Sequence, residues 1–572
     1  MNLDLKKQKN NLLFIPLGGS GEIGMNVNLY HLDGKFIMID LGLGFAHNIP
    51  GVNMIAPDLT FIKKHRKDLL GIVITHIHED HIGSVQHLWQ ELRVPVYCTN
   101  LAKNFLEAKL EEYSFKKQVK INVIDGSKKL KLGSFEMEFI GLTHSVPEMN
   151  AICVRTKFGN ILHTGDWKFD PDPVVGNISE KEKIAKIADE EGFLAIVSDS
   201  TNILNKGRSG SEGQLLENLE RIILESKGMV GVTTFASNIA RISTIAKAAI
   251  KSGRKVVLAG FSIRRLYEVG KKSGYLQDLQ QCVISENEIR SYDRNKILVL
   301  CTGCQGEINA STMKIATNNH RVIKFKSGDS MIFSSKIIPG NEKQIFNIFN
   351  LFARRKIEVI TEKTEMIHVS GHPNRDEVAE MYKIAKPKFS IPVHGEYYHI
   401  LEHRRLAKEE WGCEHANLTE NGCVIKINEN SCEKIANVET GYLAVDGKNL
   451  IPTDGKIISQ RKILQDSGAV FVIVLLSTSG EILDIDLKSV GSYDFENDPY
   501  CLNDIEDDIG NAVKSSSSEI RKAKKSLFKK EGDLSKISKS IAKGVKSKLM
   551  KNMMDLTGKK PAIEVSIMFN KS

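Results

Sequence analysis

The chain has 572 residues, of which 41% are hydrophobic and 26% charged, with 44 Gly but only 14 Pro. This balance excludes a disordered or fibrous protein, and a chain of this length is expected to fold into three or four compact domains. The formal net charge of +9 is modest for the length, so it is compatible with a polyanionic partner but does not require one.

The sequence predicts a cytoplasmic protein that does not enter a membrane. The most apolar run, residues 468–477, is only as long as a strand, and residues 1–10 lack the apolar middle of a secretion signal. Nine cysteines, an odd number without regular spacing, indicate reduced thiols. Cys301 and Cys304 form a C-x-x-C pair, but no second pair accompanies them, so a structural loop is favoured over a zinc or redox site.

The elements expected along the chain fall into three regions. Short strands dominate the first third, at residues 12–17, 35–40, 71–75, 94–99 and 135–141. After residues 196–199, apolar runs alternate with helical patterns, which indicates a parallel α/β unit; the runs are 229–234, 255–259 and 296–301, and the helices 213–224 and 239–251. Two further strands with polar ends are expected at 365–369 and 388–393.

The last region begins near residue 441. It contains strand-like runs at 470–476 and 482–485, an acidic stretch at 494–508 and a Lys-rich stretch at 521–551. Within the Lys-rich stretch, apolar residues recur at helical spacing, at Leu534, Ile537, Ile541, Val545 and Leu549. This pattern favours a packed helix with lysines on its solvent face over a segment dedicated to RNA binding.

A cluster of potential metal ligands follows the predicted strand at 71–75. His76, His78, Asp80 and His81 lie within six residues of one another, in the order H-x-H-x-D-H. Imidazoles and a carboxylate crowded in this way repel one another when charged and lack partners when buried, whereas divalent cations use both as ligands. The motif therefore predicts a metal site.

Two metal ions that share a bridging water need more ligands than this cluster offers. Candidates follow other strand-like runs: His144 after 135–143, Asp166 after 161–165 and His394 after 390–393. Each is weak evidence alone, because histidine is common at strand ends.

These residues together resemble the metallo-β-lactamase superfamily. The motifs of that family occur here in the same order: Asp40, the cluster His76–His81, then His144, the sequence Thr164-Gly165-Asp166, and His394. The resemblance implies two metal ions, one held by His76, His78 and His144 and the other by Asp80, His81 and His394, with Asp166 between them. It implies that Asp40 orients ligands without binding metal.

The additional length and motifs narrow the resemblance to β-CASP nucleases and, among them, to the bacterial ribonuclease J family. Asp199 in S-D-S-T, His372 in H-V-S-G-H and His394 in P-V-H-G-E match the three further motifs of β-CASP nucleases. The likeness extends over nearly the whole chain through three further sequences: L-G-G-S-G-E-I-G at 17–24, G-C-Q-G-E at 303–307 and T-G-K-K-P at 557–561. The domain after residue 441 matches more loosely, and Cys301 replaces a residue that is often small and polar in the family.

The resemblance implies an α/β fold: a metallo-β-lactamase αββα sandwich (1–205 and 361–440), an inserted β-CASP parallel α/β domain (206–360) and a small C-terminal α/β domain (441–572). It implies a metal-dependent ribonuclease acting on single-stranded RNA, a 5′-to-3′ exonuclease favouring 5′-monophosphate ends with additional endonuclease activity, in RNA decay and in rRNA and mRNA maturation. It also implies a homodimer or homotetramer.

Site roles follow from the same likeness. Asp80, Asp199 and His372 are the expected catalytic residues, with His372, held by Asp199, steering a proton to the leaving oxygen. His368, Ser370, Gly371 and His372 are expected to bind the 5′-phosphate of RNA. Histidine-rich ligation favours zinc, although the carboxylates also suit manganese.

Other functions fit parts of the sequence. Residues 19–24 fit the G-x-G-x-x-G pattern of dinucleotide sites, but strands are expected after it, at 26–30 and 35–40, in place of the required helix, so no nucleotide cofactor is expected. A β-CASP nuclease acting on DNA and a non-catalytic RNA-binding subunit remain alternatives. The complete set of seven candidate ligands argues against the non-catalytic subunit. A thioester or lactam hydrolase is also disfavoured, because the insert and His372 would have no role in it.

Overall fold

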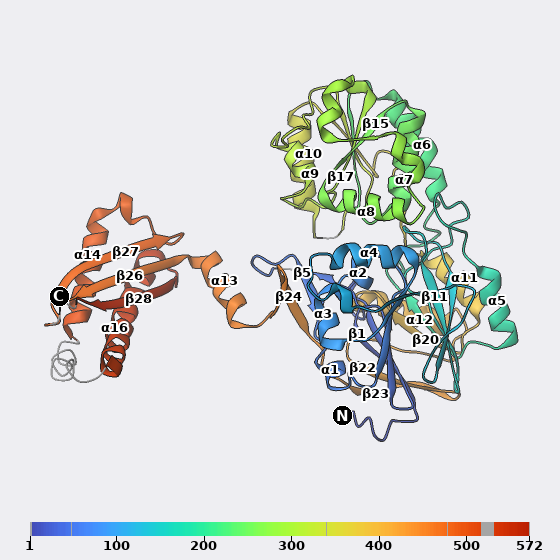
Figure 1. The fold of residues 1–572 in the computed structure, drawn as a ribbon, viewed down its shortest axis with the longest axis horizontal. Coiled ribbons are helices and arrows are strands. Elements are labelled where there is room, and N and C mark those ends of the chain that lie inside the picture. Colours follow the sequence, from blue (N-terminus) through green and yellow to red (C-terminus); the bar gives the residue numbers. More distant parts are fainter. Residues whose placement is uncertain (1–2, 47, 339, 478, 516–530, 571–572) are drawn as a thin grey trace. The chain divides into compact units, whose positions relative to one another are not determined.

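The computed structural model describes residues 3–46, 48–338, 340–477, 479–515 and 531–570. Two compact units make up the chain (Figure 1). The first comprises Met1–Phe45 and Met54–Tyr442, and the second Ala46–Asn53 and Leu443–Ser572. None of the described helices combines the length and apolarity needed to cross a membrane.

Two sheets packed face to face form the base of the first unit. One has eight strands in the order β23-β22-β1-β2-β3-β6-β7-β8, with bounds Ser431–Asn437, Cys423–Asn428, Leu12–Gly18, Val27–Leu32, Lys35–Ile39, Leu69–Val73, Val96–Cys98 and Ile121–Val123. The other has seven in the order β21-β20-β13-β12-β11-β10-β9, with bounds His415–Ala416, Phe389–Val393, Ala195–Asp199, Gly159–His163, Asn150–Thr156, Phe135–Gly141 and Leu130–Leu132. Their shared core contains Phe14, Ile37, Phe139 and Ile391.

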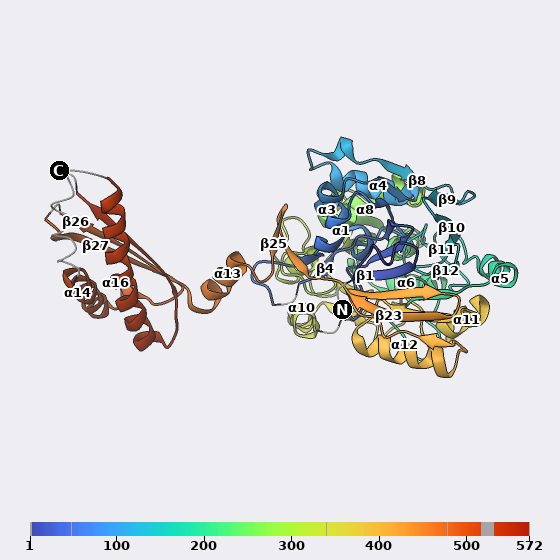
Figure 2. The same cartoon turned by 90° about the horizontal axis from the view of Figure 1, so that it is seen from below.

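Helices cover the outer faces of both sheets, which gives the expected αββα layers. On the seven-stranded sheet, α5 (Lys181–Glu190), α11 (Arg375–Ala385) and α12 (Tyr397–Glu409) contribute Ile187, Met381 and Leu406 to a second core. Figure 2 shows α3 (Val85–Leu92) and α4 (Asn100–Leu110) on the opposite side of the strands from α11 and α12. Every residue of β1 and β2 is buried, because this sheet too is covered on both faces.

The glycine-rich motif at 19–24 is followed by strands and not by a helix. The strands β2 and β3 follow it directly, as the sequence predicts. The motif therefore lacks the helix N-terminus on which a dinucleotide phosphate would rest.

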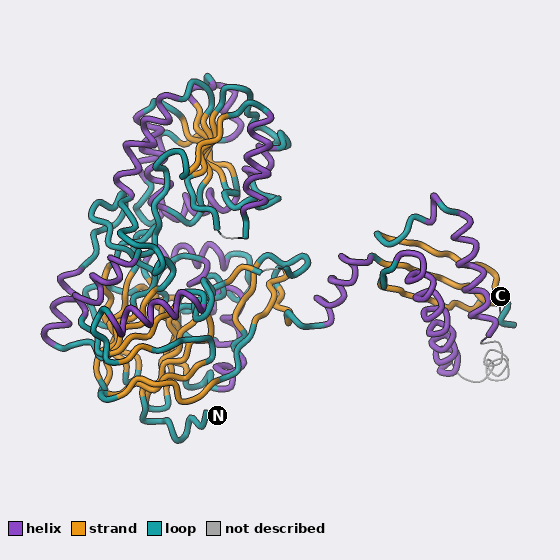
Figure 3. The backbone as a smooth tube through the Cα atoms, turned by 180° about the vertical axis from the view of Figure 1, so that it is seen from behind, coloured by secondary structure: helices purple, strands orange, loops and turns teal. Residues whose placement is uncertain are grey.

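The inserted region is a six-stranded parallel sheet surrounded by helices (Figure 3). Its strand order is β16-β15-β17-β14-β18-β19, with bounds Val283–Ile284, Lys255–Ala259, Ile297–Cys301, Val230–Thr233, Ser330–Phe333 and Glu358–Thr361. The helices are α6 (Glu212–Glu225), α7 (Ile239–Lys251), α8 (Phe261–Lys272), α9 (Ser311–Ala316) and α10 (Glu342–Arg354). Apolar runs such as Ile297–Cys301 are buried throughout, as expected for strands covered on both faces.

One predicted strand is wrong. Residues 365–369 form no strand; a turn leads into an irregular segment, 366–372, that pairs with no sheet. Its carbonyl groups are bound by side chains instead: the Ile367 oxygen accepts hydrogen bonds from Arg241 and from Ser334. The alternation of polar and apolar residues therefore reflects packing between two domains and not a β-ladder.

The second unit contains a three-stranded sheet in the order β27-β26-β28, with bounds Ile482–Val490, Ala469–Leu476 and Ala562–Phe569. Helices α14 (Pro499–Ser515) and α16 (Glu531–Thr557) pack on one face of it. The predicted packed helix is confirmed, since Ile541, Val545 and Leu549 are fully buried while Lys543 and Lys546 are exposed. The side chain of Leu534 and the lysines before residue 531 lie outside the described residues.

Candidate metal centre

Chain segments that follow the strands of both sheets meet at one edge of the first unit. The turn after β6 carries His76 and His78, the short helix α2 (Glu79–Ile82) carries Asp80 and His81, and β13 ends at Asp199. The segments after β10, β12 and β20 carry His144, Asp166 and His394. The structure thus brings together all seven residues that the sequence suggested as ligands.

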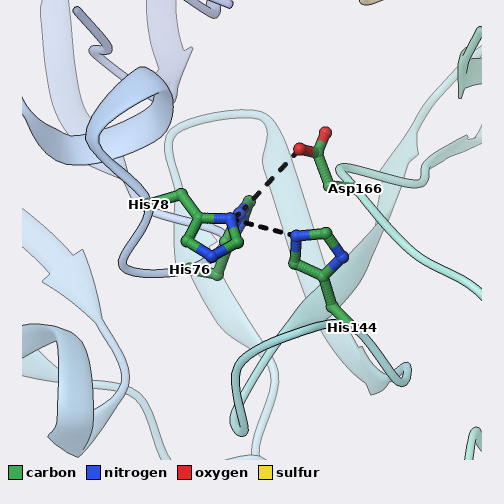
Figure 4. Close-up of side chains that lie close together, drawn as sticks. All are labelled: His76, His78, His144 and Asp166. Carbon is green, nitrogen blue, oxygen red and sulfur yellow. Dashed lines mark hydrogen bonds and ion pairs between the residues drawn. The ribbon is translucent and has the colours of Figure 1, made fainter. Parts of the chain in front are cut away.

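The first ligand group consists of His76, His78, His144 and Asp166. Nδ1 of His78 lies 3.0 Å from Nε2 of His76 and 3.0 Å from Nε2 of His144. Oδ2 of Asp166 lies 4.0 Å from Nε2 of His76. Figure 4 shows the three imidazoles and the carboxylate pointing toward one another, and one potential ligand atom from each lies within 4.8 Å of the others.

The second group consists of Asp80, His81, His394 and, again, Asp166. Oδ2 of Asp80 lies 3.6 Å from Nε2 of His81 and 3.3 Å from Nε2 of His394. The Asp166 carboxylate places Oδ2 3.1 Å from Nε2 of His81 and Oδ1 3.1 Å from Nδ1 of His394. Asp166 therefore lies between the two groups, where a carboxylate shared by two cations would stand.

Asp40 contacts the candidate ligand His81 and the turn that carries His76. It is 1% exposed, and its Oδ2 lies 2.7 Å from Nδ1 of His81, on the far side of that ring from Asp166. Its Oδ1 accepts a hydrogen bond from the Thr75 amide at 2.8 Å, which anchors the turn that carries His76. Asp40 has a positive φ of 64°, a conformation uncommon outside glycine that tends to persist where the surrounding structure demands it.

Burial and charge divide the histidines into two kinds. Burial lowers the pKa of His76 and His144 well below the ordinary value and that of His78 to about 4, so these imidazoles are neutral and offer lone pairs. Burial acts in the same direction on His81 and His394, but neighbouring carboxylates, Asp166 foremost, raise the pKa of both rings well above the ordinary value. The carboxylates thus attract positive charge, which bound metal ions would supply in place of protons.

The residues present fit divalent cations. Nε2 of His394 is buried and has no well-aligned hydrogen bond among the described residues, although the Asp80 carboxylate lies 3.3 Å from it. A buried nitrogen and carboxylate so close together need a proton or a metal ion between them. Imidazole nitrogens and carboxylate oxygens, three or four to a group, are the donor set of zinc and related ions.

Beside the second group, the partly buried His372 pairs with the fully buried Asp199. Nδ1 of His372 lies 2.8 Å from Oδ2 of Asp199 and 3.9 Å from Oδ2 of Asp166. Burial alone would lower the pKa of His372, but these two carboxylates raise it above the ordinary value. His372 therefore favours its protonated form directly next to the candidate metal ligands.

The residues predicted to bind phosphate all lie on the irregular segment 366–372. Oγ of Ser370 accepts hydrogen bonds from Asn202 Nδ2 at 2.7 Å and from the His372 amide at 3.1 Å. The Gly371 carbonyl accepts from Nδ1 of His144 at 2.6 Å, so it orients a candidate ligand. Burial lowers the pKa of His368 well below the ordinary value, so this ring would act as a neutral hydrogen-bonding group.

Three residues near the ligands escaped the sequence analysis. Thr201 Oγ1 lies 3.0 Å from Nδ1 of His394, Asn26 Nδ2 lies 3.0 Å from Nε2 of His81, and Ser145 Oγ lies 3.2 Å from Nε2 of His78. Hydroxyl and amide side chains are frequent in loops, so their types carried no signal. Only the proximity of Thr201 to Asp199 and of Ser145 to His144 in sequence could have suggested them.

Comparison with known proteins places this arrangement in a family. A model of the ribonuclease J β-CASP domain matches residues 227–352, one of the metallo-β-lactamase superfamily residues 22–208, and one of the Zn-dependent metallo-hydrolase RNA specificity domain residues 356–418. Ribonuclease J of Sinorhizobium meliloti is 36% identical over 566 residues, which cover 98% of each chain. The chain belongs to the ribonuclease J family.

Other members of the ribonuclease J family are similar over most of their length. Ribonuclease J of Thermus thermophilus is 32% identical over 83% of this chain and 84% of its own. A crystal structure of an Enterococcus faecalis V583 protein of unknown function shares the fold, with a TM-score of 0.51 and 16% identity over 73% of this chain and 100% of that chain. The predicted family and fold class, a metallo-β-lactamase domain with a β-CASP insert, are confirmed.

Proposed function

We propose that this chain hydrolyses phosphodiester bonds of single-stranded RNA with two divalent metal ions, and that it removes nucleotides in the 5′-to-3′ direction from 5′-monophosphate ends. Its family and its metallo-β-lactamase domain make it a metal-dependent ribonuclease. The observation that supports the two-metal mechanism is the pair of ligand groups that share Asp166. Internal cleavage is proposed as a second mode, and RNA decay with rRNA and mRNA maturation as the setting.

The ligand groups would hold the cations, His76, His78 and His144 one of them and Asp80, His81 and His394 the other. Bound there, two cations would supply an activated water and would neutralise charge on the phosphoryl oxygens. The protein's own contribution is to hold Asp166 between the groups and to keep three imidazoles neutral by burial.

His372 is proposed as the proton donor to the leaving 3′-oxygen. Its Nδ1 faces Asp199 at 2.8 Å, which leaves Nε2 for the substrate. The two carboxylates raise the pKa of the ring and so favour its protonated form, which a general acid requires. Asp199 receives hydrogen bonds from the Thr201 amide and hydroxyl as well, so its carboxylate is fixed while it orients His372.

The segment 366–372 is proposed as the wall that receives the 5′-phosphate. The Ser370 hydroxyl accepts two hydrogen bonds and keeps its own proton to donate. His368, held neutral by burial, adds a second donor. Because Ser370 is two residues from His372, a phosphate bound there would set the distance to the scissile bond.

The test compares RNAs of one sequence with 5′-monophosphate, 5′-triphosphate and 5′-hydroxyl ends, together with the matched DNA. We expect metal-dependent release of mononucleotides, fastest from the monophosphate, with the Asp80→Ala enzyme as the inactive control. Metal content measured in parallel distinguishes zinc from manganese. Equal rates from all three ends would refute the phosphate wall, and preferential cleavage of DNA would refute the choice of substrate.

A further inference from the structure

We infer that Arg241, which lies outside both ligand groups, is a positioning residue that holds the segment 366–372 in place. This segment carries His372 and the carbonyl group that orients His144. The inference rests on the proposed function, because it concerns how the same site is held together.

Arg241 is a fully buried cation with a dedicated partner. It lies on α7 of the insert and is 0% exposed. Nε and Nη2 donate to the two carboxylate oxygens of Glu212 at 2.6 and 3.0 Å. This two-pronged contact balances the charge in the interior and fixes the plane of the guanidinium group.

The remaining donors of Arg241 face the end of strand β18 and the segment 366–372. Nη1 donates to the Ser334 carbonyl at 3.0 Å and to the Ile367 carbonyl at 3.2 Å. The Ser334 hydroxyl donates to the same Ile367 oxygen at 2.6 Å. Since this stretch belongs to no sheet, side-chain donors take the place of a β-ladder in holding its backbone.

The held carbonyl lies just upstream of the catalytic cluster. Four residues after Ile367, the Gly371 carbonyl accepts from Nδ1 of His144 at 2.6 Å. The fit is close, because a Cβ atom at Gly371 would stand 2.9 Å from Cε1 of His144. One residue further, His372 faces Asp199. Movement of the segment would therefore displace a candidate metal ligand and the candidate proton donor together.

A second buried arginine provides a matched control. Arg254 is 4% exposed and donates to the carbonyl groups of Gly228, Ile223 and Ser226. These precede β14 in the chain, whereas Ser334 follows the carboxyl end of the neighbouring parallel strand β18, so the two arginines act at opposite ends of these strands. Loss of Arg254 removes buried hydrogen bonds to backbone carbonyl groups without touching segment 366–372.

The experiment compares the E212Q/R241M, R241K and R254M variants of the full chain with the wild type. The double variant removes both buried charges, a change that commonly leaves folding intact. A lysine in R241K keeps the charge beside Glu212 but cannot reproduce the planar set of donors. For each protein we would measure thermal unfolding, bound metal, amide hydrogen exchange within 366–372, and kcat and KM on 5′-monophosphorylated RNA.

Both Arg241 variants are expected to exchange amides within 366–372 faster and to lose on the order of tenfold to a hundredfold in kcat, with a smaller change in KM. R254M is expected to unfold at a lower temperature while it keeps the wild-type exchange in this segment and the wild-type kcat. Unchanged exchange in both Arg241 variants, or an equal loss of kcat in R254M, would overturn the inference. A wild-type chain inactive on every RNA would instead refute the proposed function, and the exchange comparison would still decide the role of Arg241.

Discussion

Nδ1 of His372 lies 2.8 Å from Oδ2 of Asp199, although the two residues are 173 positions apart in the sequence. Asp199 ends the last strand before the insert, and His372 follows the last strand of the insert. The chain thus leaves and re-enters the metallo-β-lactamase domain at one place, where Asn202 and Asn374 also pair through their backbones. The pair sits at the base of the insert, beside the ligands.

The charge of Asp199 should control how activity depends on pH. The pKa of His372 is raised because Asp199 and Asp166 outweigh burial, so the protonated ring is present below that pKa and is lost as the pH rises through it. Asp199→Asn removes one of these charges and lowers the pKa of His372. The fall in kcat on the alkaline side should therefore move to lower pH, with a loss of about 10²–10⁴ once the ring is neutral.

The measurement is the profile of kcat between roughly pH 5 and 8 at saturating metal, a range in which histidines commonly titrate. His372→Gln serves as the comparison, since it should have low activity at every pH in this range. An Asp199→Asn enzyme with the wild-type profile would show that His372 is not the proton donor.

Loss of a single ligand from either group should abolish hydrolysis. In His78→Ala the first group loses the nitrogen that lies close to both other imidazoles, and in Asp80→Ala the second loses one of its two carboxylates. Activity should fall by about three orders of magnitude or more, because metal binding lowers the pKa of water from about 15.7 to about 7. Circular dichroism should show an intact fold, and full activity in both variants would refute the ligand assignment.

Removal of metal should also destabilise the first unit. A metal that binds only the folded state adds about 2.7 kcal/mol at a free concentration one hundred times its dissociation constant. Chelation should therefore lower the unfolding temperature, and zinc or manganese should restore it. The His78→Ala protein should respond less to the chelator; an unchanged unfolding temperature in the wild type would argue against a structural contribution of the metal.

The second unit offers a test of stability that is separate from the site. Leu549→Ala should cost about 2–5 kcal/mol, because the side chain is fully buried between α16 and the sheet. Lys543→Ala, on the exposed side of the same helix, should change stability by less than about 0.5 kcal/mol. Chemical denaturation of the two variants would measure the difference, and equal effects would contradict the packing described for α16.

The sequence predicted His76, His78, Asp80 and His81 as candidate ligands from local pattern and chemistry, because they follow a strand-like run. The other three candidates were weak evidence alone and were added by the family resemblance: His144, Asp166 and His394. Local pattern failed at 365–369, where the partners are Arg241 and Ser334, distant in sequence and donating through side chains. The role of the Gly371 carbonyl was hidden for the same reason, since a backbone group carries no mark in the sequence. Local sequence pattern does not predict contacts between residues of different domains.

The order of the ligands along the chain has a consequence for synthesis. The first ligand is His76 and the last is His394, and strand β1 pairs with β22, which ends only at Asn428. A growing polypeptide on the ribosome therefore holds an incomplete centre until about three quarters of it has been made, and loop closure over such a separation is slow. The chain thus has no complete ligand set to hold metal ions during most of its own translation.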